Sequence, residues 1–396
     1  MEFKGYLRPD GQVGIRNYTV VLPTIGCANE LAWEISECVE GVTLLTHNHA
    51  CIRVGKDQER AHHTLRSILR NPNVGGALIV GLGCEPLHAK VLFDQVKDCG
   101  KTLDYVSLDE VKNADELIAL GEKKLRAIKA AVDPLERTPQ PVSKLTLGIK
   151  CGGSGAVSAI ASNPAVGRAA DLLIENGAKV IFTETAELIG AEHVLARRAA
   201  TPQVKEKLLG CVKHMMDEIE RYGVDILGSE PTQGNIKNGL TTIEEKSLGA
   251  ISKGGTTPLV DVLEYGQKPD RTGLYFMDGT TQASQLFLGM FSAGAQIQIF
   301  SYAGGLPARI RGLPSYPPGL STLPILKVLG SCADADEKDH FDIYAGSVLT
   351  AEESIDQVGQ RIFDAILAVA SGELCYTEKK RRYTEMLQVY ADGLLM

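Results

Sequence analysis

Residues 80–86 read VGLGCEP, and residues 150–155 read KCGGSG. Each stretch follows an apolar run that is typical of a buried strand, and each then turns through glycines beside a cysteine. In open α/β sheets, ligands gather at the carboxyl ends of the strands, where loops and helix N-termini meet. The two stretches therefore predict an α/β fold that presents a thiol at two strand ends.

Apolar runs of strand type alternate with helical patterns along the chain, which predicts mostly parallel, doubly wound sheets. A polar stretch with three prolines, DPLERTPQPVSK at residues 133–144, follows a predicted helix and is the best linker in the sequence. It divides the chain into two predicted α/β lobes, residues 1–138 and 145–396. The predicted strands cover residues 18–26, 76–83, 102–108, 145–150, 178–185, 295–305 and 323–331.

The helix predicted after the KCGGSG turn has clear end signals. Asn163 is a typical N-cap residue, Pro164 suits the first helical position, and Gly177 follows the end. These signals predict a helix over residues 163–177, between two parallel strands.

Composition limits the class of protein. The chain has 396 residues, 44% hydrophobic content and a formal net charge of −8. This size allows one large core or two smaller ones, and the charge disfavours a general nucleic-acid surface. No apolar run has the flanks of a signal peptide or the roughly 18 residues of a membrane span. We therefore expect a soluble cytoplasmic protein with no nucleic-acid or membrane partner.

Nine cysteines are scattered along the chain without close spacing. This pattern favours free or metal-bound thiols over a disulfide framework. Cys27, Cys84 and Cys151 each end a predicted strand. The alternative for each is a small buried hydrophobic residue, which is a common role of free cysteine.

The residues after Cys151 are small. The backbone amides of Gly152, Gly153 and Ser154 could form an anion-binding nest ahead of the next helix. A plain tight turn explains these glycines equally well.

Two further clusters carry polar ligands. THNHACIRVGKDQERAHH, residues 46–63, has a density of imidazole and thiol groups that suits Fe(II), Zn(II) or Mn(II), although its spacing matches no compact zinc motif. Surface histidines in a polar loop are the alternative. TETAELIGAEH, residues 183–193, places glutamates just after a predicted strand, where they either face the cleft or form a solvated first helical turn. The residues of interest are His47, His49, Cys51, His62, His63, Glu184, Glu187, Glu192 and His193.

Five stretches, in order, resemble the catalytic domain of the altronate and galactarate dehydratase family, which includes the large subunit of sulfolactate sulfo-lyase. The resemblance implies a lyase that eliminates water, or sulfite, from a small hydroxy acid with a divalent metal, typically Fe(II). The stretches are GYLRPDGQVGIRNYTVVLPTIGCAN (5–29), NPNVGGALIVGLGCE (71–85), KCGGSGAVSAIASNPAVG (150–167), TETAELIGAEHVLARRA (183–199) and GLTTIEEKSLGAISKGG (239–255).

The resemblance implies candidate roles for particular residues. Elimination requires removal of a C2 proton while charge grows on the carboxylate, departure of the 3-hydroxyl with a proton, and collapse to a 2-keto-3-deoxy acid. The metal candidates are His49, Cys51, Cys84 and Glu85, with Cys151 and Ser154 on the facing turn. The acid or base candidates are Glu184, Glu187 and His193, and the carboxylate anchors are Arg16, Lys150 and Arg197. Mn(II) can replace Fe(II) in this scheme, and an iron–sulfur cluster on Cys51, Cys84 and Cys151 is the alternative cofactor.

The chain departs from the family pattern at two places. Gly155 stands where relatives usually have an aspartate, and SYAGGLPARIRG, residues 301–312, replaces a glycine- and threonine-rich segment. The second change adds Arg309 and Arg311, which predicts a more anionic substrate unless these arginines serve an interface or the surface.

The chain begins at the catalytic motif, as split-subunit members of the family do. We therefore expect either a separate small subunit or a homo-oligomer that works without one.

Two other functions stay open at this point. Gly153-Ser154-Gly155 after a strand, with Glu184 ending the next strand, resembles a dinucleotide-binding oxidoreductase, although the third glycine of that motif is missing. The altered segment at residues 301–312 also allows a non-catalytic binding subunit that keeps the fold.

Overall fold

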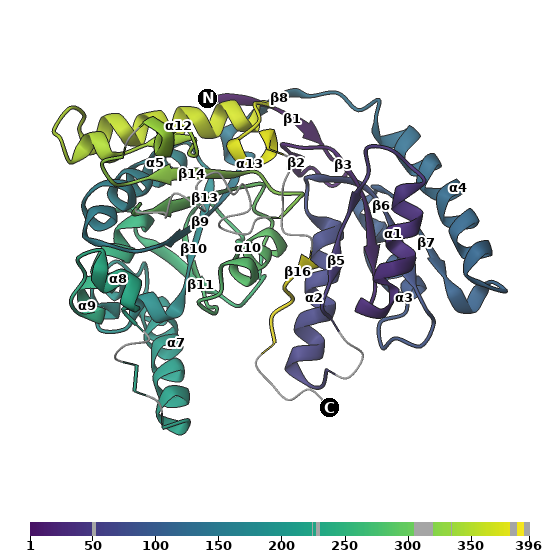
Figure 1. The fold of residues 1–396 in the computed structure, drawn as a ribbon, viewed down its shortest axis with the longest axis horizontal. Helices are drawn as coiled ribbons and strands as arrows, with labels where there is room; N and C mark the ends of the chain where they lie inside the picture. The colour runs from purple at the N-terminus through teal and green to yellow at the C-terminus, as the bar shows by residue number, and fades with distance from the viewer. Residues whose placement is uncertain are drawn as a thin grey trace.

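A computed structural model describes residues 1–49, 53–223, 225–226, 230–304, 320–333, 335–380 and 386–391. The fold is α/β with two parallel sheets, as the sequence predicts (Figure 1). Among the described residues, no helix has the length and apolar character needed to cross a membrane.

The first sheet has four parallel strands in the order β4-β3-β6-β7. Successive side chains of a strand point to opposite faces, so Val20 and Val21 enter two different cores. Helices α1 and α4 cover one face, and α2 and α3 cover the other. The bounds are β3 Tyr18–Pro23, β4 Thr43–Leu44, β6 Val74–Gly81, β7 Thr102–Ser107, α1 Asn29–Glu37, α2 Lys56–Arg70, α3 Ala89–Val96 and α4 Ala114–Val132.

The second sheet has seven parallel strands in the order β11-β12-β10-β9-β13-β14-β15. Helices α5, α7 and α12 pack on one face and α10 on the other. The strand order reverses at β9, because the chain places β10 on one side of it and β13 on the other. The bounds are β9 Thr146–Gly152, β10 Lys179–Thr183, β11 Leu259–Leu263, β12 Gly273–Met277, β13 Ile297–Tyr302, β14 Ile325–Leu329, β15 Ile343–Tyr344, α5 Asn163–Glu175, α7 Pro202–Arg221, α10 Ala283–Ser292 and α12 Ile355–Ala370.

The two sheets share one apolar core. Leu22 and Ile79 of the first sheet belong to the same buried cluster as Phe287 of α10 and Phe300 of β13. Figure 1 shows α2 and α10 between the two sheets. The carboxyl ends of both sets of strands are therefore held in a fixed relation by hydrophobic packing.

Two smaller pairings connect distant parts of the chain. β1 Glu2–Leu7 pairs antiparallel with β2 Val13–Gly14 and with β8 Thr138–Pro141, so part of the predicted linker is a strand. β16 Met386–Leu387 pairs parallel with β5 Thr46–His47 in a separate two-stranded sheet, and so brings the last described residues to the N-terminal part of the chain. The remaining helices are α6 Glu192–Ala196, α8 Gln233–Lys237, α9 Ile243–Ile251, α11 Ala335–Lys338 and α13 Tyr376–Lys379.

The start of α5 differs from the prediction. Asn163 is not an N-cap, because its backbone is helical and a π-helical turn, Ser158–Ser162, runs directly into α5. Its side-chain amide donates to the carbonyl of Gly249 instead. The predicted end is correct, since Gly177 follows the helix with a φ of 87°.

Two buried lysines differ in how their charge is compensated. Lys101 donates to the carbonyls of Leu69 and Asn71 at 3.0 and 2.6 Å. Lys327, which is 2% exposed, lies over the Phe341 and Tyr376 rings, and within the described ranges no carboxylate comes within 4.0 Å of its ammonium. Burial lowers the pKa of Lys327 to about 8.

We predict opposite effects of the same substitution at these lysines. Lys327→Met should raise the free energy of unfolding by about 1–3 kcal/mol, because it removes a poorly compensated buried charge. Lys101→Met should lower it by a similar amount, because two buried carbonyls lose their donor. The gain from Lys327→Met should shrink as pH rises from 8 toward 10.5, where wild-type Lys327 is neutral in the fold. Chemical denaturation checks both variants, and equal losses would contradict the prediction.

Candidate active site

The turn at residues 81–87 is built around Glu85. Its carboxylate accepts hydrogen bonds from the amides of Leu82 and Gly83 at 3.1 and 2.7 Å, and from the Thr24 hydroxyl at 2.8 Å. These bonds fasten the loop that follows β6 to the end of β3. The neighbouring Cys84 is exposed. The described contacts of Glu85 are thus those of a structural carboxylate.

The turn at residues 150–155 lies where the strand order reverses. A Cβ on Gly153 would lie 2.2 Å from a ring atom of Tyr302, and its φ is 57°, so this position requires glycine. The carbonyl of Ser154 accepts from the Asn235 side chain at 2.9 Å. These constraints direct Cys151, at the end of β9, into the buried space beside β10. The anion nest at residues 152–154 stays a prediction.

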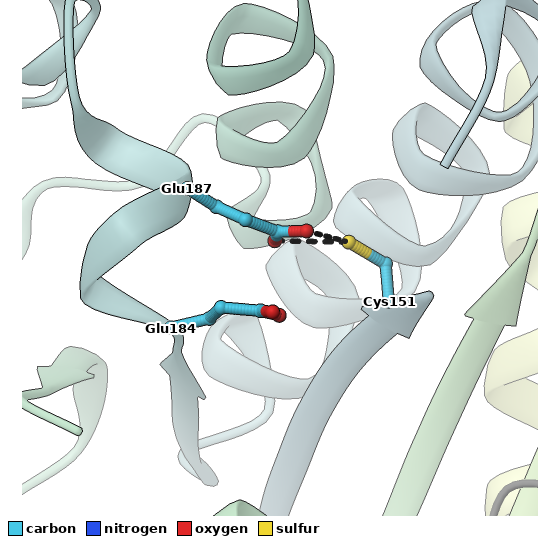
Figure 2. Close-up of side chains that lie close together, drawn as sticks. All are labelled: Cys151, Glu184 and Glu187. Atoms are coloured by element: carbon cyan, nitrogen blue, oxygen red, sulfur yellow. Dashed lines mark hydrogen bonds between the residues drawn. The ribbon is translucent and has the colours of Figure 1, made fainter. Parts of the chain in front are cut away.

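The next strand supplies two carboxylates. Glu184 follows β10 with a φ of 98°, a left-handed conformation that is strained for a residue with a side chain. The short helix Thr185–Leu188 then brings Glu187 to the same side. Figure 2 shows both carboxylates directed toward Cys151, whose thiol lies 3.1 Å from a Glu187 oxygen.

The three side chains form a compact donor group. Ligand atoms of Cys151, Glu184 and Glu187 all lie within 4.8 Å of one another, and each residue is buried. Among the described residues, no other set of three or more histidine, cysteine or acidic side chains comes this close together.

Two lysines neutralise the carboxylates. Lys150 Nζ lies 2.8 Å from Glu184 Oε2, and Lys253 Nζ is ion-paired with Glu187 and 3.2 Å from Cys151 Sγ. Lys253 is held in place by α9, whose first turn is capped by the Thr242 side chain.

The sequence analysis missed Lys253, although its motif is among those that carry the resemblance. A signal was present, because Lys246 and Lys253 are seven residues apart, a spacing that places two side chains on the same face of a helix. Lys246 is ion-paired with Glu230, and its ammonium contributes to the positive field at Glu187.

Burial and charge push the pKa values of the two glutamates apart. Desolvation, with Glu187 adding to it, raises the pKa of Glu184 to about 7. Desolvation also opposes ionisation of Glu187, but the charges of Lys253, Lys150 and Lys246 together outweigh it and lower the pKa of Glu187. Burial, with Glu187, raises the pKa of the Cys151 thiol to about 12, so the thiol is protonated in this state.

The donor group fits a divalent transition metal. A sulfur and two carboxylates are ligand types that Fe(II), Zn(II) and Mn(II) accept, and a metal would deprotonate the thiol on binding. The same oxygens are bound by the Lys150 and Lys253 ammonium groups in this structure. A bound metal would therefore take over the charge compensation that these lysines provide.

Comparison with known proteins decides the family. Residues 142–391 match the family described as D-galactarate/altronate dehydratase, C-terminal. Residues 5–133 match the second domain of D-galactarate dehydratase/altronate hydrolase. The chain belongs to the altronate and galactarate dehydratase family. This membership places it among the carbon–oxygen lyases, as the resemblance implies.

Curated relatives cover nearly the whole chain. The β subunit of (2R)-sulfolactate sulfo-lyase from Chromohalobacter salexigens is 33% identical over 93% of this chain and 92% of its own length. Altronate dehydratase from Bacillus subtilis is 30% identical over 95% of this chain and 75% of its own. Galactarate dehydratase (L-threo-forming) from Escherichia coli is 31% identical over 94% of this chain and 73% of its own length.

Arg16, a predicted carboxylate anchor, is fully paired within the fold. Its guanidinium pairs with Glu378 through two bonds of 2.6 and 2.7 Å, and its other N–H groups donate to the carbonyls of Ile15, Val369 and Glu373. All five donors of the guanidinium are thus used. The residue ties the segment after β2 to the C-terminal region of the chain.

The predicted metal neighbourhood around the first turn is not assembled in the described residues. His49 is buried and both of its ring nitrogens lack hydrogen-bond partners, but the ring faces His62 rather than Cys151. Cys84 is exposed and is not part of the Cys151 group. An iron–sulfur cluster needs several cysteines close together. Among the described residues, the Cys151 donor group contains one cysteine. Cys51, Arg309 and Arg311 lie outside the described residues.

His193 and Arg197 are exposed, at the start and just past the end of α6, and neither belongs to the donor group. Of the predicted catalytic residues, the structure therefore brings together Lys150, Glu184 and Glu187. Cys151 joins them from the predicted metal ligands.

We predict that Lys253 is required for the stability of the site. Lys253→Met should lower the free energy of unfolding by about 3–5 kcal/mol, because it leaves an ionised carboxylate buried without its partner. The double variant K253M/E187Q should recover part of this loss. Lys246→Met is the matched control and should cost less, since its partner Glu230 is more exposed. Denaturation of the four proteins checks this, and equal losses for the two single lysine variants would contradict it.

Proposed function

We propose that this chain removes water from a small hydroxy acid and releases a 2-keto-3-deoxy acid. The observation that carries the proposal is the buried Cys151, Glu184 and Glu187 group at the carboxyl ends of β9 and β10. This is the edge of a parallel sheet at which substrates bind, at the point where the strand order reverses.

The charged residues suit proton removal next to a carboxylate. Lys150 and Lys253 place two ammonium groups where negative charge grows during elimination, and a buried site strengthens that interaction. Glu184 is the group suited to accept the C2 proton, because its strained backbone fixes the carboxylate toward the site and burial raises its pKa toward neutrality. Glu187 stays ionised beside Lys253.

A divalent metal would be held by Cys151 and Glu187, with Glu184 close enough to bind it as well. We favour Fe(II) as this metal. When bound, the metal supplies Lewis-acid stabilisation of the developing carboxylate charge.

Sulfite elimination is the second candidate activity. It is favoured by the sulfo-lyase β subunit, which this chain matches over 92% of that protein's length. The word subunit in that name also supports a separate partner chain, which we propose to be small, with a homo-oligomer as the alternative.

The substrate class can be tested directly. We expect a screen of aldonic, aldaric and sulfo-hydroxy acids, with Fe(II) under reducing conditions, to give 2-keto acid from at least one of them. Sulfite release without 2-keto-3-deoxy acid formation would favour the second activity. No turnover with any acid, alone or with a co-purified partner from the native host, would contradict the proposal.

The metal site can be tested with two cysteine variants. Cys151→Ser should lower the bound iron at least tenfold, because a hydroxyl is a poorer ligand for a soft metal than a thiolate. Cys84→Ser is the matched control and should keep the wild-type metal content, since Cys84 is exposed and outside the group. Elemental analysis of anaerobically purified protein measures both, and metal loss in Cys84→Ser alone would reverse the assignment.

A further inference from the structure

A cavity lies at the opposite edge of the large sheet from the donor group. Its volume is about 320 Å³, and its walls come from the β1–β2 turn, the starts of β9 and β10, and the end of α10. Thr146, which begins β9, lines it, and Cys151 is five residues further on. The cavity is therefore about 17 Å from the donor group along the strand.

The walls of the cavity are strongly cationic. Lys144, Lys179 and Lys268 line it together with one carboxylate, that of Asp10. Within the described ranges, none of the three ammonium groups lies within 4.0 Å of an acidic side chain, and Asp10 is bonded to Gln12. The chain as a whole has a net charge of −8. The positive charge of this cavity therefore contrasts with the negative net charge of the protein.

Two of the lysines are held in place by the β1–β2 turn. Lys144 donates to the carbonyl of Gly11 at 3.0 Å, and Lys268 donates to the side-chain carbonyl of Gln12 at 2.6 Å. Each ammonium has three N–H donors, so two remain on each lysine. No acceptor for Lys179 is found among the described residues. Several charged donors thus surround one space without a matching set of acceptors.

The lysines also repel one another. Desolvation lowers the pKa of Lys268, Asp10 opposes this shift, and the charges of Lys179 and Arg70 add to it. Folding therefore gathers like charges that a bound anion would compensate. The walls come from both sides of the shared core, so a bound anion would bridge the two sides.

We propose that this cavity binds a small polyanion, of the phosphate or di- and tricarboxylate class, at a site separate from the donor group. The inference does not rest on the proposed lyase activity. Its ligand would be held by Lys144, Lys179 and Lys268 and would stabilise the junction between the β1–β2 turn and the second sheet.

The test uses inorganic phosphate and citrate as probes, with sodium chloride at matched ionic strength as the reference. Phosphate or citrate should raise the melting temperature of the whole protein above the chloride value, and calorimetry should give saturable binding. Lys179→Gln should weaken that binding at least tenfold and leave the unliganded protein folded, because the Lys179 ammonium donates to no acceptor among the described residues. Lys123→Gln is the matched control, because Lys123 is an exposed lysine of α4 that pairs with no acidic side chain in the described part of the chain.

Two results would overturn the proposal. One is that phosphate and citrate raise the melting temperature no more than sodium chloride does at the same ionic strength. The other is binding that Lys179→Gln and Lys123→Gln affect equally. Because the readouts are stability and calorimetry, failure here is distinct from failure of the lyase assay.

Discussion

The ion pair between Lys253 and Glu187 is the interaction on which the candidate site depends. A carboxylate at this depth pays a large desolvation cost, which only a nearby positive charge can offset. With Glu187 held ionised, its charge disfavours ionisation of both Glu184 and the Cys151 thiol. Lys253 thus favours the ionised form of Glu187, and the charge of Glu187 adds to the effect of burial at Glu184 and Cys151. The positions of helix α9 and strand β9 fix how closely these groups approach.

Much of the architecture was readable from local pattern. Apolar runs such as residues 76–83 and 145–150 are long, β-rich and bounded by glycine, so they identify buried parallel strands. The strand order was not readable in this way, because it depends on which runs pair across the whole chain. The same is true of β8, whose prolines read as a linker but whose backbone pairs with the first strand at the sheet edge.

The site was predictable where residues follow strands directly. Lys150, Cys151, Glu184 and Glu187 all lie at or just beyond the ends of adjacent strands, so parallel topology brings them together. Arg16 and Glu85 make structural contacts that their motifs do not indicate, because a charged residue in a family motif can stabilise the fold as well as bind a substrate. Arg16 pairs with Glu378, and Glu85 accepts from the amides of a tight turn. The spacing of residues in the sequence indicates neither contact. Lys253 is about one hundred residues from Cys151, and only the packing of α9 reveals that they touch.

The strand pair β5–β16 has a consequence for how the protein is made. The Val389 amide donates to the Asn48 side chain, and Arg53 donates to the carbonyl of Tyr390. The partners of this early-synthesised segment thus lie some 340 residues later in the chain. Until residues 386–387 have left the ribosome, β5 lacks the strand that pairs with it among the described residues. Nascent or prematurely terminated chains would expose an open edge, which is a template for association with other chains. The β5–β16 pair can therefore form only after residues 386–387 have been synthesised.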